Sequence, residues 1–163
     1  MAEKRTTTTR RAALPRLHSR PMQTSFTIAT PGPSLTDFTA DVARWVRASG
    51  AAHGLLTLFV RHTSCSLLIQ ENADPDVQAD LAAFLRRLVP PADDPAMDWI
   101  AHRAEGPDDM PAHIKAALLP VSLQIPVADG RLALGTWQGI YLVEHRARPH
   151  RRTVAAHLAG DPA

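Results

Sequence analysis

Histidine and carboxylate side chains gather in one loop-like stretch, residues 98–115, which reads D-W-I-A-H-R-A-E-G-P-D-D-M-P-A-H-I-K. In it, His102 and His113 bracket the acidic residues Glu105, Asp108 and Asp109. Polar groups that gather in a loop serve binding or chemistry more often than packing. Imidazole and carboxylate together can bind a borderline divalent metal or share a proton transfer. The spacing matches no standard zinc motif, so a solvated acidic loop is the alternative.

Two further polar clusters strengthen the case for a site. One spans residues 61–75 and contains H-T-S and E-N-A-D-P, and the other spans residues 135–146 and contains G-T-W-Q-G and E-H-R. Glu71 and Asn72 begin a loop that leaves a predicted strand, where side chains can face a pocket. Asp74 has a structural alternative, because an Asp-Pro pair is a common way to cap a helix.

Long motifs in these clusters resemble the YjbQ family, small proteins known as secondary thiamine-phosphate synthases. The motifs are HTSxSLxxxENxDPxV over residues 62–77, EGxDDMPAHIK over 105–115 and DGRLxLGTWQGIYLxEHR over 129–146. The resemblance runs from about Met22 to the C-terminus. It implies a homotrimer with pockets near the subunit boundaries. It also implies a reaction that joins a pyrimidine pyrophosphate to a thiazole phosphate, either as the main activity or as a side activity.

We therefore predict a metal-assisted enzyme that acts on a small phosphorylated molecule. The predicted catalytic residues are Glu71, Asp74, His113 and Glu144. The predicted substrate- or phosphate-binding residues are Asn72, Thr136, Gln138, Arg151 and Arg152. The predicted ligands of a divalent metal, Zn or Mg, are His62, His102 and His113.

Each of these assignments has a structural alternative. His62 ends an apolar strand, where a histidine is often a core residue with satisfied nitrogens. His113 lies in the first turn of a predicted helix, where the helix dipole keeps imidazole neutral, the form that a metal requires. Residues 135–139 form either an anion-binding turn or simply a tight turn. Glu71, Asp108 and Asp109 would together hold a metal-bound pyrophosphate.

Length and composition bound the class of protein. The chain has 163 residues with 45% hydrophobic content and one cysteine, which suits a single domain with a core of its own. Cys65 lies in an apolar segment, so we expect it to be a small buried residue. No apolar run approaches the roughly 20 residues of a membrane span. We expect a cytoplasmic protein without a membrane partner.

The first 22 residues carry six basic residues and one acidic residue, a net charge of +5 in a chain whose total is +2. This stretch is rich in Thr and has no apolar periodicity, so we predict a flexible arm over residues 1–21 and one domain over 22–163. The arm lacks aromatic residues between its charges, which disfavours a nucleic-acid partner. We expect the arm to be a start-site extension, because Met22 directly precedes the first predicted strand.

Periodicity and turn residues predict the elements that position these clusters. We predict strands over residues 23–29, 54–60, 121–127, 131–135, 139–146 and 153–158, with 64–70 continuing the second strand through a kink. We predict helices from a cap at Ser34 or Thr36 to Ser49, from Asp74 to Leu88, and over 111–118. No βα alternation recurs, which disfavours a doubly wound sheet. The predicted fold is a single-domain α+β structure, with helices packed on an antiparallel sheet or sandwich.

Two other classes of function remain open. A non-catalytic module could bind a small ligand or a metal through the same pocket, and measured turnover separates it from an enzyme. Nucleic-acid binding through the basic arm is the third class, which deletion of residues 1–21 would test.

Overall fold

The computed structural model of the protein describes residues 22–162, so the predicted arm lies outside the described residues. Within this part the chain forms eight strands, three α-helices and one short 3-10 helix. In chain order the elements are β1 (Met22–Thr30), β2 (Ser34–Asp37), α1 (Thr39–Ala48), β3 (Ala51–Val60), β4 (Cys65–Glu71), α2 (Pro75–Leu88), η1 (Pro95–Met97), α3 (Asp109–Leu118), β5 (Ser122–Ala128), β6 (Arg131–Leu132), β7 (Gln138–Glu144) and β8 (His150–Pro162).

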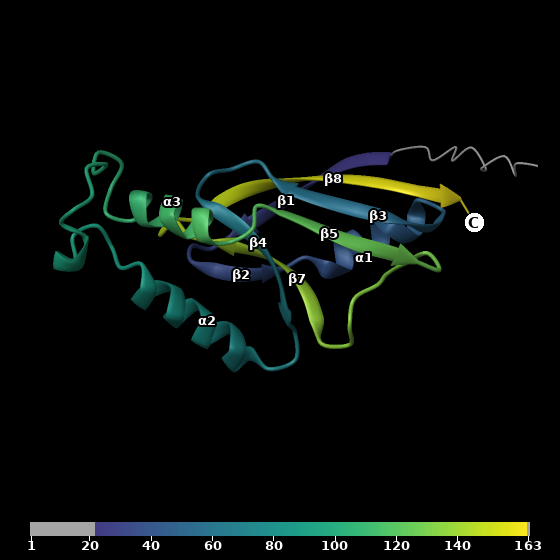
Figure 1. Cartoon of the computed structure of the whole chain (residues 1–163), viewed down its shortest axis with the longest axis horizontal. Helices are drawn as coiled ribbons and strands as arrows, with labels where there is room; N and C mark the ends of the chain where they lie inside the picture. Colours follow the sequence, from purple (N-terminus) through teal and green to yellow (C-terminus); the bar gives the residue numbers. More distant parts are fainter. Residues whose placement is uncertain (1–21, 163) are drawn as a thin grey trace, which may run out of the picture.

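The strands form two antiparallel sheets (Figure 1). The larger sheet has the order β1-β8-β3-β5-β6, and the smaller has the order β2-β7-β4. Apolar side chains from both sheets and from α1 make one core, in which Val42, Leu56 and Leu142 are completely buried. The predicted α+β fold with antiparallel strands in a single domain is confirmed.

The start of the first helix differs from the prediction. Ser34–Asp37 is a strand that pairs with β7, and α1 begins only at Thr39. The Asp37 carboxylate accepts hydrogen bonds from the backbone N–H of Thr39 at 2.8 Å and from its hydroxyl at 2.6 Å. The side chain that organises this helix start is therefore Asp37, and the predicted caps at Ser34 and Thr36 were wrong.

The kinked strand predicted through residues 54–70 is in fact two strands in different sheets. β3 belongs to the larger sheet and β4 to the smaller one, and residues 61–64 cross between them. Cys65, the first residue of β4, is fully buried, as predicted. Its burial raises the pKa of the thiol to about 11, so the thiolate is scarce near neutral pH.

The helix α2 begins as predicted, but its apolar stripe is not buried. Asp74 caps it by accepting a hydrogen bond from the N–H of Asp76 at 2.9 Å, and Pro75 occupies the first turn. No residue of α2 is buried in the single chain, and Phe84 and Leu88 are 57% and 53% exposed. Packing against the rest of the chain therefore covers this helix only in part.

The loop between α2 and α3 has a small core of its own, which fixes the approach to α3. Val89, Ala92, Met97 and Ile100 are buried there. The guanidinium of Arg103 donates hydrogen bonds to the carbonyls of Ala92, Met97 and Ile100. This long loop is therefore ordered by its own contacts.

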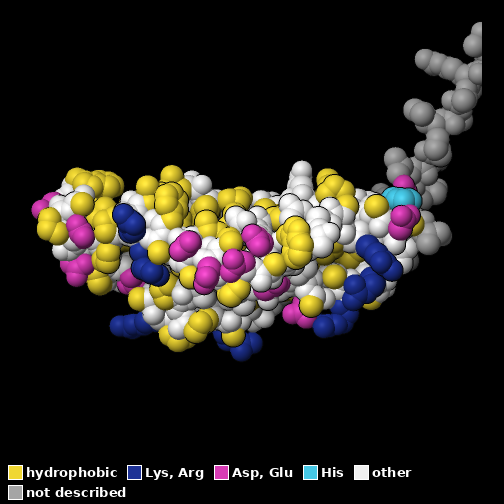
Figure 2. All heavy atoms as spheres, turned by 90° about the horizontal axis from the view of Figure 1, so that it is seen from below, with side chains coloured by type: hydrophobic (Ala, Val, Ile, Leu, Met, Phe, Trp, Pro, Cys, Tyr) yellow, Lys and Arg dark blue, Asp and Glu magenta, His cyan; other side chains and the backbone are white. Residues whose placement is uncertain are grey.

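None of the helices in residues 22–162 is long and apolar enough to cross a membrane. On the face seen from below in Figure 2, acidic side chains lie between groups of Lys and Arg, with hydrophobic side chains along the whole length.

Candidate functional site

The first two turns of α3 bring an acidic residue and a histidine to one face of the helix. The helix starts at Asp109, after a turn in which Gly106 has φ of 98°. Asp109 and His113 are four residues apart, and side chains at this spacing are neighbours on a helix surface. The ordered loop before α3 then returns His102 to the same place.

Asp109 is the centre of this group. Its Oδ2 lies 2.8 Å from Nε2 of His102 and 3.3 Å from Nε2 of His113. The Asp109 side chain is only 3% exposed, whereas those of His102 and His113 are 43% and 35% exposed. The carboxylate thus lies at the base of a shallow site, with the two imidazoles at its opening. Glu105, 3.8 Å from His102, stands at its rim.

The crossing segment between the two sheets orients His113. The Nδ1 atom of His113 lies 3.0 Å from the carbonyl oxygen of Thr63. A carbonyl can only accept, so Nδ1 carries the proton when the ring is neutral and Nε2 keeps its lone pair. That lone pair faces Asp109, in the arrangement by which a backbone carbonyl orients a metal-binding histidine.

Arg146, which follows β7, anchors the acidic pair. It donates from Nε to Oδ2 of Asp108 at 2.8 Å and from its guanidinium to Oδ1 of Asp109, and the N–H of Ala147 also donates to Asp108. Burial alone would raise the pKa of Asp109, but the hydrogen bond from His102 and the charge of Arg146 outweigh it and lower that pKa. Asp109 is therefore a fixed anion beside two imidazoles.

The donor atoms of His102, Asp109 and His113 all lie within 4.8 Å of one another. Zn²⁺ binds such atoms at about 2.0–2.2 Å, which puts tetrahedral neighbours about 3.3–3.5 Å apart. The separation of 3.3 Å between Asp109 and His113 already matches this, and the His102 contact needs to open by less than an ångström. The nitrogens of His102 and His113 lie within 4.8 Å of each other, so they need to approach by at most about 1.5 Å. The three residues therefore fit a borderline divalent metal with two nitrogen ligands and one oxygen ligand, and a further position open to solvent.

His62 is not part of this group. Its Nε2 accepts a hydrogen bond from the backbone N–H of Thr153 at 2.8 Å, which ties the end of β3 to β8. Burial and the charge of Arg152 lower the pKa of His62. Its side chain does share a surface cavity with His113. The structure therefore groups His102 and His113 with Asp109 and not with His62, whose Nε2 is occupied by a backbone hydrogen bond, as in its structural alternative.

Glu144 and Arg152 form a buried ion pair that joins the two sheets. Arg152 donates to both carboxylate oxygens at 2.6 Å, and Thr30 and the N–H of Arg146 also donate to Glu144. The Glu144 side chain is completely buried and that of Arg152 is 6% exposed. The predicted catalytic role of Glu144 and the predicted phosphate-binding role of Arg152 do not fit this saturated pair. Arg151, next to it on β8, is exposed.

The other predicted residues lie at the opposite end of the smaller sheet (Figure 1). The group of His102, Asp109 and His113 adjoins the start of β4 through Thr63, whereas Glu71 ends that strand, six residues after Cys65. At about 3.3 Å per residue this separates the two places by roughly 20 Å. The predicted residues at the far end are Glu71, Asn72, Asp74, Thr136 and Gln138. Within one chain they do not meet His102, Asp109 and His113, so Glu71 cannot hold a metal together with Asp108 and Asp109 of the same subunit.

Gln138 and Asn72 organise the loops at this far end. The side-chain oxygen of Gln138 accepts from the N–H of Gly135 at 2.8 Å, and Asn72 donates to the carbonyl of Gln138 at 3.4 Å. The side chain of Thr136 is exposed. The residues 135–139 thus form the tight turn that was the structural alternative.

Three consecutive residues at the end of β7 contact three different parts of the chain. Glu144 enters the ion pair with Arg152, and Arg146 reaches the acidic pair at the start of α3. His145 lies between them and is 6% exposed, with Nε2 2.9 Å from the hydroxyl of Ser66. Burial, and then the charge of Lys115, lower the pKa of His145 to about 4.

Two contributors to the site were not assigned from the sequence. The Thr63 carbonyl has no side-chain signal, so only the fold reveals it. Asp109 was expected to hold pyrophosphate, yet its spacing of four residues from His113 could have indicated a shared ligand face.

The sequence matches the family described as "UPF0047 protein YjbQ-like" over residues 24–161. A UPF0047 protein of Synechocystis sp. is 53% identical over 142 residues, which cover 87% of this chain and 94% of that protein. The YjbQ protein of Salmonella typhimurium is 50% identical over 108 residues, which cover 66% of this chain and 75% of that protein.

Solved structures agree with this relationship. A hypothetical protein of Aeropyrum pernix superposes with a TM-score of 0.76 at 32% identity, over 86% of this chain and 99% of that one. A protein of Clostridium acetobutylicum, described as an uncharacterised member of the YjbQ/UPF0047 family, gives a TM-score of 0.73 at 34% identity, over 83% of this chain and 98% of that one. The names of these relatives state no reaction. Sequence and structure together show that this chain belongs to the YjbQ-like UPF0047 family.

Proposed function

We propose that the chain is a metal-assisted enzyme for a small phosphorylated molecule, with His102, Asp109 and His113 as the metal ligands. The observation that carries the proposal is the contact of Asp109 Oδ2 with both Nε2 atoms, together with the Thr63 carbonyl that orients His113. Nitrogen ligands favour Zn²⁺ or a similar borderline ion over Mg²⁺, which prefers oxygen. A metal so bound would polarise a phosphoryl oxygen or lower the pKa of a bound water.

The chain's own residues would hold and tune this site. Arg146 keeps Asp109 ionised and in place, so that one carboxylate oxygen faces the imidazoles. Binding of a metal displaces the proton that His102 and Asp109 share, so affinity should fall at acid pH. The class of reaction comes from the resemblance, which supports formation of thiamine phosphate from two phosphorylated precursors as the first activity to assay.

We also propose a homotrimer in which each site lies at a subunit boundary. The outer face of the larger sheet exposes Leu55 and Phe59 at 40% and 48%, and α2 leaves its apolar stripe uncovered. A ring of subunits would bury such faces. It would also allow Glu71 of one subunit to approach the metal group of the next, which the separation within one chain forbids.

A metal titration with paired assays tests the metal site. The wild-type protein, stripped with EDTA, should bind one Zn²⁺ per chain, and His113→Ala should bind it at least a hundredfold more weakly. The matched control is His53→Ala, because His53 is also partly exposed but lies beside Asp129 in a distant turn. Stoichiometric zinc in His113→Ala would refute the site. Zinc binding without turnover of the thiamine precursors, or of other phosphorylated molecules, would favour a non-catalytic metal-binding module.

A further inference from the structure

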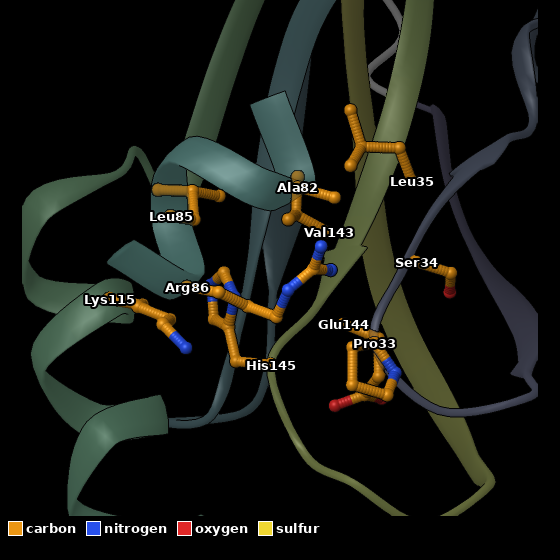
Figure 3. Close-up of a pocket in the computed structure, with 10 residues that line it drawn as sticks. All are labelled: Pro33, Ser34, Leu35, Ala82, Leu85, Arg86, Lys115, Val143, Glu144 and His145. Atoms are coloured by element: carbon orange, nitrogen blue, oxygen red, sulfur yellow. The ribbon is translucent and has the colours of Figure 1, made fainter. Parts of the chain in front are cut away.

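A second cavity lies on the other side of α3 from the metal ligands. Lys115 follows His113 by two residues, and side chains at that spacing point to different faces of a helix. The cavity has a volume of about 60 Å³, and Lys115, Arg86 of α2 and His145 line it. Figure 3 shows that Lys115 and Arg86 enter it from two different helices.

The cavity carries positive charge without a free carboxylate. Neither Arg86 nor Lys115 lies within 4.0 Å of a carboxylate oxygen in the described part of the chain. Glu144 also lines the cavity, but Arg152, Thr30 and a backbone N–H already bind its oxygens. Asp108, the carboxylate whose charge acts on Lys115, is itself bound by Arg146.

The two positive charges of the cavity act on each other and on His145. The charge of Arg86 acts on Lys115, and that of Lys115 adds to burial in keeping His145 neutral. Lys115 is partly buried, which weakens the screening of its charge, whereas Arg86 is exposed and His145 is buried and neutral. Arg86 and Lys115 thus place two like charges on the wall of one cavity, and an anion bound between them would offset their repulsion.

We propose that this cavity binds the phosphate group of a small ligand through Arg86, Lys115 and His145, independently of any metal. A cavity of about 60 Å³ holds four to six times the roughly 10–15 Å³ that one water needs, which suits the five heavy atoms of a phosphate group. Arginine matches two phosphate oxygens with its planar fork, and lysine adds a compact charge. The ligand is either inorganic phosphate or a phosphate monoester whose organic part remains outside the cavity.

Calorimetric titration of the full chain tests this, with EDTA present and the ionic strength held constant with chloride. The two probes are inorganic phosphate and glycerol phosphate. We expect saturable binding in the wild type and a loss of about tenfold to a hundredfold in affinity in Arg86→Gln and in Lys115→Met. Arg87→Gln is the control, because Arg87 is the next residue on the same helix but lines a different cavity with Phe84.

Thermal unfolding distinguishes binding from a purely structural role of Lys115. In phosphate-free buffer, Lys115→Met should unfold at the wild-type temperature or above, because one of two repelling charges is gone, and it should lose the rise that phosphate gives the wild type. Tighter binding of glycerol phosphate would identify a phosphate monoester as the ligand, and binding of inorganic phosphate alone would identify the free ion. Absence of saturable binding, or equal binding in the wild type, Arg86→Gln and Lys115→Met, would overturn the proposal. The presence of EDTA makes this result independent of the metal site.

Discussion

Replacement of Asp109 by Asn should remove the metal while keeping most of the surrounding structure. Asparagine has the same shape, and its amide oxygen can still accept the hydrogen bond from Arg146. The atom that then replaces Oδ2 is the amide nitrogen, a donor that cannot bind a metal. If the amide is turned the other way, the oxygen that faces the imidazoles is only a weak neutral ligand. Mutation of residues that only support a metal ligand typically lowers affinity 10–100-fold. Asp109 touches both imidazoles itself, so we expect at least a hundredfold loss, or about 2.8 kcal/mol.

Asp108→Asn is the matched comparison. Asp108 is adjacent in sequence and also binds Arg146, but it contacts neither His102 nor His113. Each variant weakens a charged hydrogen bond to Arg146, so each metal-free protein should lose about 1–3 kcal/mol of unfolding free energy. Only Asp109→Asn should also lose zinc affinity, whereas Asp108→Asn should stay within about tenfold of the wild type.

Competition with a zinc chelator and urea unfolding with and without zinc provide the assay. At a free zinc concentration of 100 times the wild-type dissociation constant, bound metal stabilises the wild type by about 2.7 kcal/mol. At that same concentration a hundredfold weaker site gains only about 0.4 kcal/mol. An Asp109→Asn protein that binds zinc within threefold of the wild type would refute the assignment of Asp109. An Asp108→Asn protein that loses zinc equally would show that zinc affinity depends on the contacts of Arg146 with the two aspartates, and not on Asp109 as a ligand.

Three further results should follow from the same structure. Folding lowers the pKa of His145 to about 4, from about 6.5 when unfolded, so protonation at acid pH favours the unfolded chain. Between pH 6.5 and pH 4 the unfolding free energy should fall by roughly 3 kcal/mol for this reason. Urea unfolding of His145→Gln across this pH range should lack that loss. Glu144→Gln should lower the unfolding free energy by about 3–5 kcal/mol because it leaves the buried Arg152 uncompensated, and a loss below about 1 kcal/mol would contradict a structural role. If sites form between subunits of a ring, refolding an equal mixture of inactive Glu71→Gln and His113→Ala chains should restore about one quarter of wild-type turnover. The reason is that one site in four receives both intact residues. Activity absent from the mixture but present in the wild type would place the two residues in separate sites.

Local chemistry made part of the fold predictable. The start of α2 needed only an Asp-Pro pair, because a carboxylate that accepts a backbone N–H and a proline that lacks one both suit a first helical turn. The alternating apolar and polar residues of β1 and the apolar run of β3 could likewise be recognised from each strand's own sequence. By contrast, the short strand Ser34–Asp37 depends on pairing with β7, about a hundred residues away, which no local pattern encodes.

The candidate site shows the same division. His102 and His113 stood out because they share a loop with carboxylates, and the structure does bring them together. His62 ended a strand beside a polar motif, but the sequence could not show that a backbone N–H of β8 occupies its nitrogen. The sequence shows Glu144 and Arg152 only as two separate charged residues. Their ion pair joins two sheets and forms only when the chain has folded. Arg86 was not considered, since an isolated arginine on a helix surface carries no signal before a neighbouring lysine is placed beside it.

The contacts of the consecutive residues Glu144, His145 and Arg146 also limit which insertions and deletions the chain can tolerate near the end of β7. Insertion or deletion of one residue within β7 would turn Glu144 to the other face of the sheet and shift the residues after it by one place, because successive residues of a strand face opposite ways. The ion pair of Glu144 with Arg152, the cavity lined by Arg86 and Lys115, and the contact of Arg146 with the start of α3 would then all be disrupted. Variation around His102, Asp109 and His113 should therefore come by substitution in the loop before α3, whereas the length of β7 is constrained by all three contacts at once.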